Sequence, residues 1–175
     1  MTHAPETPSD KTFREMSIVL DRSLQFEHSC TKLARDYWRS CCNGIQMPSR
    51  TDLNPVAMRK FASHTGLIEV RPSDRDAADY FIRLAGSEWE QVFGRMTGRF
   101  LHEFLNEKIE ARWRAVFDVV RDEAAPLRVL APIAFEPKNW LTSEMFVAPL
   151  GQNGLVSMLF MTFVAWSKSK SATSD

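Results

Sequence analysis

The C-terminal part of the chain contains the pattern that most restricts the fold: three strand-like segments joined by two very short links. The segments cover residues 127–135, 140–150 and 155–165 and are rich in apolar side chains. The links, residues 136–139 and 151–154, contain the proline, asparagine and glycine typical of tight turns. Links this short cannot hold a crossover helix, so the three strands are predicted to be antiparallel neighbours.

The longest apolar stretch, residues 155–166, is interrupted only by Ser157 and Thr162. A membrane-spanning helix needs about 20 predominantly apolar residues, so this stretch is too short to cross a bilayer. Because both of its faces are apolar, it is predicted to be a central strand of the sheet.

Two further strands are predicted earlier in the chain, at residues 66–70 and 80–85, and the polar residues between them suit a hairpin. Residues 87–93 are predicted to form a short helix, for which Ser87 and Glu90 have the spacing of a capping box. Strands that are separated by helices in this way indicate an α+β fold with an antiparallel sheet.

The clearest helix is predicted over residues 107–123, with Asn106 as its N-cap. A single helical turn or two is expected just before it, at residues 100–104. The buried stripe of the long helix is expected to consist of Ile109, Trp113, Val116, Phe117 and Val120.

The region before residue 66 is predicted to be mostly helical. Residues 13–42 follow a helical period, with a break near Ser29 as an alternative, and a short helix over residues 55–62 is expected after Asn54. The resulting organisation is a disordered N-terminus (1–11), a helical extension (12–65), a core (66–166) and a disordered tail (167–175).

Charge and cysteine content exclude several classes of protein. Lys and Arg together number 22, as do Asp and Glu, and a neutral chain argues against a nucleic-acid partner. The three cysteines lack the regular spacing of a disulfide framework. The polar N-terminus has no apolar run, so neither a signal peptide nor a membrane anchor is expected. A cytoplasmic protein without a membrane partner is therefore expected.

Four stretches of the sequence resemble the PAS domain family, and in particular a subgroup of bacterial stand-alone single-domain PAS proteins. They are PSRTDLNP (48–55), GLIEV (66–70), YFIRLAGS (80–87) and FGRMTG (93–98). The order of predicted elements is similar as well. The resemblance covers roughly residues 33–166 and implies a five-stranded antiparallel sheet with helices on one face, preceded by the N-terminal helical extension.

The resemblance also implies a non-enzymatic sensory or regulatory module that binds a small ligand, a signalling partner protein, or both, between sheet and helices. The alternative is that the same side chains simply fill a core. The candidate pocket consists of Phe81, Arg83, Trp89, Phe93, Phe104, Trp113, Phe117, Met145, Val147, Leu159 and Met161.

Arg83 shares a strand face with Phe81, because side chains two residues apart in a strand point the same way. If that face points inward, Arg83 needs a counter-charge, which an anionic ligand would supply. The alternative is that Arg83 reaches solvent at the end of the strand.

PAS domains frequently dimerise through a helix that precedes the core, so a homodimer is expected. The candidate contact is the stripe of Leu33, Tyr37 and Trp38. The same stripe could instead cover the outer sheet face of its own chain, and the two interpretations are compatible in a dimer.

The sequence does not identify a cofactor. Residues 89–120 contain no cysteine, which argues against a flavin photoadduct, and a lone His102 is weak support for a haem ligand. His28 and His64 have no partners at metal-ligand spacing, so no metal site is expected.

No catalytic motif is found in the sequence, and no kinase, cyclase or phosphodiesterase output domain is expected in the residues outside the core. The alternative function is an α+β pocket enzyme, such as an isomerase or dehydratase, with an unrecognised acid–base pair. The candidates for that pair are His102, Glu103 and Glu144, which no spacing joins.

Overall fold

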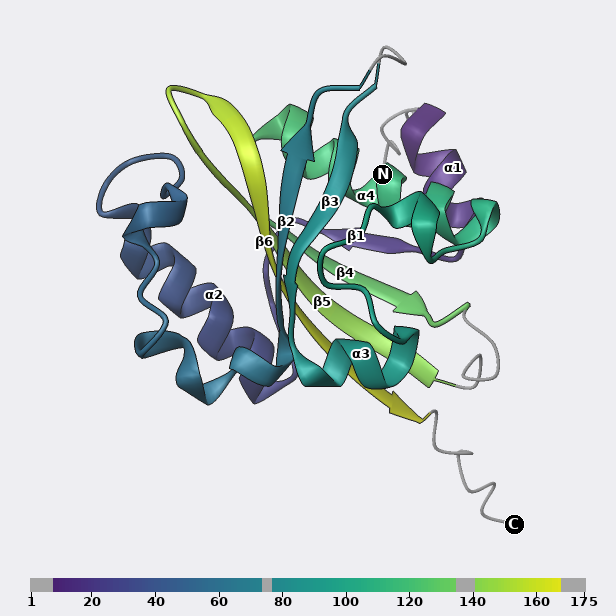
Figure 1. Ribbon diagram of the computed structural model, residues 1–175, viewed down its shortest axis with the longest axis horizontal. Coiled ribbons are helices and arrows are strands. Elements are labelled where there is room, and N and C mark those ends of the chain that lie inside the picture. The colour runs from purple at the N-terminus through teal and green to yellow at the C-terminus, as the bar shows by residue number, and fades with distance from the viewer. Residues whose placement is uncertain (1–7, 74–76, 135–140, 168–175) are drawn as a thin grey trace, which may run out of the picture.

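The computed structural model describes residues 8–73, 77–134 and 141–167 (Figure 1). The expectations of disorder for residues 1–7 and for the tail from residue 168 lie outside these ranges, as does the turn expected at residues 136–139. Residues 8–11, also expected to be disordered, instead begin helix α1 (Pro8–Glu15).

The described residues form one antiparallel sheet of six strands in the order β1-β4-β5-β6-β2-β3, which confirms the predicted α+β class. The strands are β1 (Val19–Asp21), β2 (Thr65–Arg71), β3 (Asp79–Ala85), β4 (Leu127–Pro132), β5 (Leu141–Gln152) and β6 (Leu155–Ser167). Strand β6 pairs with both β5 and β2, so the prediction of a central position is confirmed.

The strand that the sequence did not predict is β1. Its three residues pair with β4, Val19 opposite Leu130 and Asp21 opposite Arg128, and extend the expected five strands to six. One helical pattern over residues 13–42 is therefore wrong, whereas the alternative of two helices with a break near Ser29 agrees with a second helix that begins at Ser29. Helix α1 ends where Ser17 adopts a left-handed φ of 57°, and the second helix, α2, covers Ser29–Cys42.

Helices cover both faces of the sheet. Figure 1 shows α2 on one side, whereas α1, α3 (Ser87–Phe93) and α4 (Glu107–Glu123) gather on the other. The prediction of helices on one face holds for the core helices α3 and α4, but α2 covers the second face. Short 3-10 turns occur at Arg50–Asp52, Ala57–Lys60, Ala62–His64 and Leu101–Glu103, and two of them replace the helix expected at residues 55–62.

The alternation of side chains along the central strands divides the apolar residues into two cores. On β6, Leu159, Met161 and Phe163 belong to the inner core beneath α3 and α4. Phe160 belongs to the outer core, where it packs with Trp38 of α2 and Phe146 of β5. Both faces of the middle strands are thus buried, as their continuous apolar sequence indicates.

Two predicted helix starts have different outcomes. Asn106 caps α4 as predicted, because its side-chain oxygen accepts a hydrogen bond from the Ile109 backbone N–H at 3.0 Å. The capping box of Ser87 and Glu90 is wrong: Gly86 is the N-cap of α3. A β-carbon on Gly86 would lie 2.2 Å from the carbonyl oxygen of Ser63, so this close approach requires glycine.

Candidate functional site

The candidate site is a cavity of about 50 Å³ between α4 and the inner face of the sheet. Most of its lining comes from α4 and from strands β4 to β6, and Ile18 closes it from the N-terminal side. The lining residues are Ile18, Phe93, Ile109, Arg112, Trp113, Val116, Phe117, Val129, Ala131, Pro132, Ile133, Ala134, Ser143, Met145, Met161 and Phe163.

The cavity is small because aromatic rings fill most of the space over the sheet. The Trp113 ring lies 4.9 Å from Phe93 and 5.7 Å from Trp89, centroid to centroid, both in edge-to-face geometry. The Phe163 ring packs against Phe93 in a tilted geometry, with 5.6 Å between the ring centroids. A volume of 50 Å³ holds a water molecule or two, whereas an apolar cavity that binds benzene has about 150 Å³.

Five of the residues predicted for a pocket line the cavity together: Phe93, Trp113, Phe117, Met145 and Met161. Four more lie in the same inner core without lining the cavity. Trp89, Val147 and Leu159 are fully buried there, and the partly buried Phe104 packs beside them.

Phe81 and Arg83 do not line the cavity. They share one face of β3 as predicted, but the inner face of that strand carries Tyr80 and Ile82. The Arg83 side chain is 64% exposed and lies 3.6 Å from the Glu69 carboxylate. The alternative that Arg83 reaches solvent is therefore the correct one.

Arg112 of α4 is the one ionisable residue among the described residues that line the cavity. Its guanidinium donates to the carbonyl oxygen of Met16, at the end of α1, and to that of Pro132 at 3.3 Å. Burial lowers the pKa of Arg112, and no carboxylate in the described ranges opposes that effect. The helical period could have found this residue, because it lies three positions after Ile109 and four before Val116 on the apolar side of α4.

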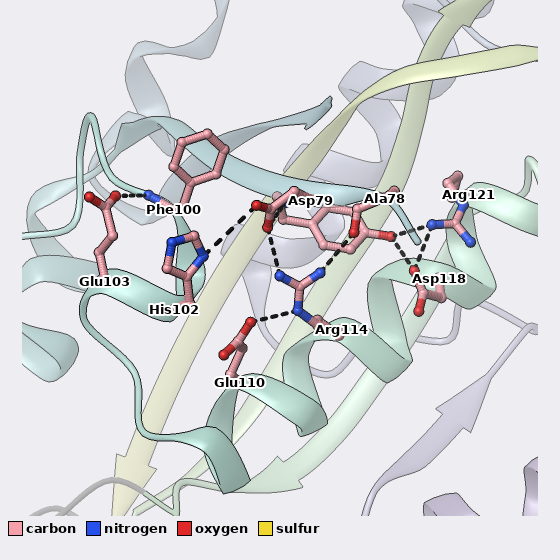
Figure 2. Close-up of polar contacts among 10 residues, drawn as sticks. Ala78, Asp79, Phe100, His102, Glu103, Glu110, Arg114, Asp118 and Arg121 are labelled. Atoms are coloured by element: carbon pink, nitrogen blue, oxygen red, sulfur yellow. Dashed lines mark hydrogen bonds and ion pairs between the residues drawn. The ribbon is translucent and has the colours of Figure 1, made fainter. Parts of the chain in front are cut away.

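A polar cluster fixes α4 to the edge strand β3, on the other side of the helix (Figure 2). The Arg114 guanidinium binds the carboxylates of Asp79 and Glu110, each at 2.6 Å, and donates to the Ala78 carbonyl oxygen at 2.7 Å. One turn later, the Asp118 carboxylate accepts hydrogen bonds from the Tyr80 hydroxyl at 2.6 Å and from Arg121 at 2.8 Å. These bonds hold the helix that roofs the cavity.

His102 lies at the rim of this cluster and not in the cavity. Its imidazole is 52% exposed, stacks against Phe100, and lies 3.8 Å from the Asp79 carboxylate (Figure 2). Its neighbour Glu103 accepts the Phe100 backbone N–H, which closes the 3-10 turn. Neither side chain reaches the cavity lining.

Comparison with known proteins assigns the fold just described. The family model of the PAS domain matches residues 26–162. The chain belongs to the PAS domain family. A solved structure of an RNA-binding light-oxygen-voltage receptor is similar to it, with 15% identity and a TM-score of 0.45. That match covers 69% of this chain and 37% of the receptor, so the chain spans little more than a third of that protein. No curated protein matches the chain.

PAS domains are sensory and regulatory modules. The matched range contains α2 and all of the described cavity lining except Ile18 and Phe163. None of the helices in the described ranges is long and apolar enough to span a membrane. Within the same ranges, no three His, Cys, Asp or Glu side chains converge in a way that could hold a metal ion.

Glu144 lies on the opposite face of this PAS sheet, so it cannot form an acid–base pair with His102 or Glu103. Its fully buried carboxylate accepts hydrogen bonds from the backbone N–H groups of Glu27 and His28, from the Thr31 hydroxyl and from Arg128. Burial alone would raise the pKa of Glu144, but the hydrogen bonds from Thr31, Glu27, His28 and Arg128 outweigh it and lower the pKa. The group is an ionised structural anchor.

The same face carries the residues predicted for a dimer contact. Trp38 is only 4% exposed and its indole N–H donates to the Pro149 carbonyl oxygen at 3.0 Å, so it covers its own sheet and is not available to a partner. Tyr37 packs its ring against Phe61. Leu33, 44% exposed, is the member of the three that faces solvent.

Proposed function

We propose that this PAS domain is a non-enzymatic cytoplasmic sensor that binds a small apolar ligand in the cavity beneath α4. The observation that carries the proposal is the cavity itself, because it lies in an otherwise close-packed core and its lining is almost entirely apolar. Apolar clefts with one or two polar groups are the usual form of small-molecule sites.

The methionines in the lining support a site that adjusts to its occupant. Met145 projects from β5 and Met161 from the neighbouring β6, and both side chains border the cavity. An unbranched thioether changes rotamer easily and fills irregular space, so these two side chains can enlarge the cavity when a ligand enters.

We include in the proposal a homodimer and a signalling partner protein that reads the ligand-bound state. What supports a separate partner is that the candidates for an acid–base pair do not converge on the cavity. Glu144 lies across the sheet from it, and His102 lies at the surface.

Xenon tests whether the cavity admits an apolar guest, because a single xenon atom suits a space of this size. We expect xenon to shift the ¹³C-methyl NMR signals of Met145 and Met161 and to leave that of Met58, in the outer core, unchanged. Unchanged Met145 and Met161 signals would contradict a ligand cavity.

A matched pair of variants places the xenon site. Ala131→Val adds two methyl groups to the cavity lining and should abolish the shifts. Ala165→Val adds the same groups to a partly buried position on β6 outside the lining, and should leave them intact. Shifts that persist in Ala131→Val would locate the xenon elsewhere.

A further inference from the structure

Arg112 differs from the other two arginines of α4, which are also partly buried. On α4, Arg114 pairs with Asp79 and Glu110, and Arg121 pairs with Asp118 and Asp122. Arg112, on the same helix, contacts no carboxylate among the described residues and bonds only to two backbone carbonyl oxygens.

The same contrast holds on the outer face, where Arg128 binds Glu144 at 2.8 Å and Asp21 at 3.3 Å. Nearby carboxylates raise the pKa of Arg128 against the opposing effect of burial. A partly desolvated cation without a carboxylate partner is costly, so a guanidinium in this state beside a cavity favours an anionic ligand.

The guanidinium of Arg112 still has donors to offer. It carries five N–H groups in a planar fork, and its two hydrogen bonds go to Met16 and Pro132. The remaining donors are sufficient for a carboxylate, which arginine binds through two parallel hydrogen bonds.

The rest of the lining defines the other part of the ligand. Apart from Arg112, the one polar side chain in the described lining is Ser143, whose hydroxyl donates to the Ala131 carbonyl oxygen at 2.9 Å. The interior therefore suits a hydrocarbon. A cationic ligand is disfavoured, because the guanidinium of Arg112 borders the cavity and carries a positive charge.

We infer that the ligand is a short apolar carboxylic acid, whose carboxylate binds Arg112 and whose hydrocarbon chain enters the cavity between Met145 and Met161. This inference rests on the proposed function and names the ligand class of the same cavity. The small volume selects a short chain, and movement of the two methionine side chains sets the upper limit of its length.

Three compounds with six carbon atoms each separate the contribution of the head group to affinity from that of the hydrocarbon chain. They are hexanoate, 1-hexanol and hexylamine. Titrations followed by the Met145 and Met161 methyl signals should show hexanoate binding at least about tenfold more tightly than hexanol, the range of a charge-assisted hydrogen bond. Hexylamine should bind most weakly.

Arg112→Gln should remove the preference for hexanoate over hexanol while leaving hexanol affinity unchanged. Lys108→Gln, which removes the same charge from an exposed position on the same helix, should change hexanoate affinity by no more than about twofold, as expected for a screened surface charge. Arg112→Lys, which retains the charge without the planar fork, should keep part of the preference.

The outcomes distinguish the two proposals. Equal binding of hexanoate and hexanol by the native protein overturns the carboxylate class but leaves the cavity as a ligand site. A hexanoate preference that survives in Arg112→Gln removes Arg112 as the recognising group. If none of the compounds nor xenon shifts the two methyl signals, the proposed function itself fails. Equal binding of hexanoate and hexanol, and the absence of any shift, are both measured on the native protein, so these two outcomes do not depend on the stability of the variants.

Discussion

The carboxylate of Glu144 receives hydrogen bonds from four residues although none of its surface meets solvent. The two backbone donors, Glu27 and His28, lie at the start of α2, and that helix has neither an acidic residue in its first turn nor a side-chain N-cap. Glu144 from β5 therefore supplies the negative charge that stabilises the positive end of a helix. One residue thus connects the sheet to the N-terminal segment.

Glu144→Gln should lower the free energy of unfolding by about 3 kcal/mol, because it leaves the buried Arg128 without its main counter-charge. Urea denaturation measures the loss. Glu123→Gln, which breaks the exposed ion pair with Arg22, should cost at most about 1 kcal/mol. Equal losses in the two variants would contradict the role of Glu144 as an anchor.

The pH dependence of stability follows from the same carboxylate. Its folded-state pKa lies below the ordinary value of 4.5, so its stabilising contribution is complete above that value. The contribution is lost as the pH falls from 4.5 through the lower folded-state pKa. Native protein should therefore lose more stability than Glu144→Gln over this interval.

At the scale of elements, α2 presents different residues to its own sheet and to solvent. Trp38 packs in the outer core with Phe146 and Phe160, whereas Leu33 lies on the exposed side of the helix. A substitution on the sheet side of α2 therefore tests the packing of the helix, and a substitution on its solvent side tests contact with a second copy of the chain.

Trp38→Ala should lower the free energy of unfolding by about 3–5 kcal/mol, as for other large core truncations. Leu33→Arg should change it by less than about 0.5 kcal/mol but reduce the light-scattering mass of the homodimer to 20.1 kDa, that of one chain. A native protein that already has this mass would contradict the dimer. A dimer that survives Leu33→Arg would place the contact elsewhere.

Local sequence patterns predicted the helices and hairpins that are determined by residues close together in the chain. The apolar period and the Asn106 cap located α4, and the short links located the β5–β6 hairpin. Strand β1 could not be found in this way, because its three residues depend on pairing with β4, more than 100 residues later.

The residues of the candidate site also divide into those that local sequence patterns predict and those that depend on long-range contacts. Five of the predicted residues line the cavity because the period of α4 and the alternation of β5 and β6 define their buried faces. Alternation placed Phe81 and Arg83 together but did not say which face of the edge strand β3 is buried. Ile18 reaches the cavity from the N-terminal segment through long-range packing, which no local pattern encodes.

At the scale of the whole molecule, two cores share one sheet. Removing α2 would expose Phe146 and Phe160 of the outer core, on the same strands that carry Met145 and Met161 of the inner core. The strands that supply the outer core, β2, β5 and β6, also carry residues of the inner core, so the outer core has no strand that could unfold separately. The described part of the chain is therefore expected to unfold in one cooperative transition.

Fluorine NMR of protein labelled with 5-fluorotryptophan measures this cooperativity, because each indole gives a separate signal. Trp38 lies in the outer core, and Trp89 lies in the inner core. We expect their native signals to disappear at the same urea concentration. Earlier loss of the Trp38 signal would show that α2 detaches as an independent unit.

Met145 and Glu144 are consecutive residues of β5 whose side chains leave the backbone on opposite sides. The first borders the cavity, and the second binds the start of α2. Their α-carbons are held about 3.8 Å apart by the geometry of one peptide unit. A backbone shift of β5 at Met145 is therefore also a shift at Glu144, and the link between cavity and helix is made by covalent bonds rather than by a series of side-chain contacts.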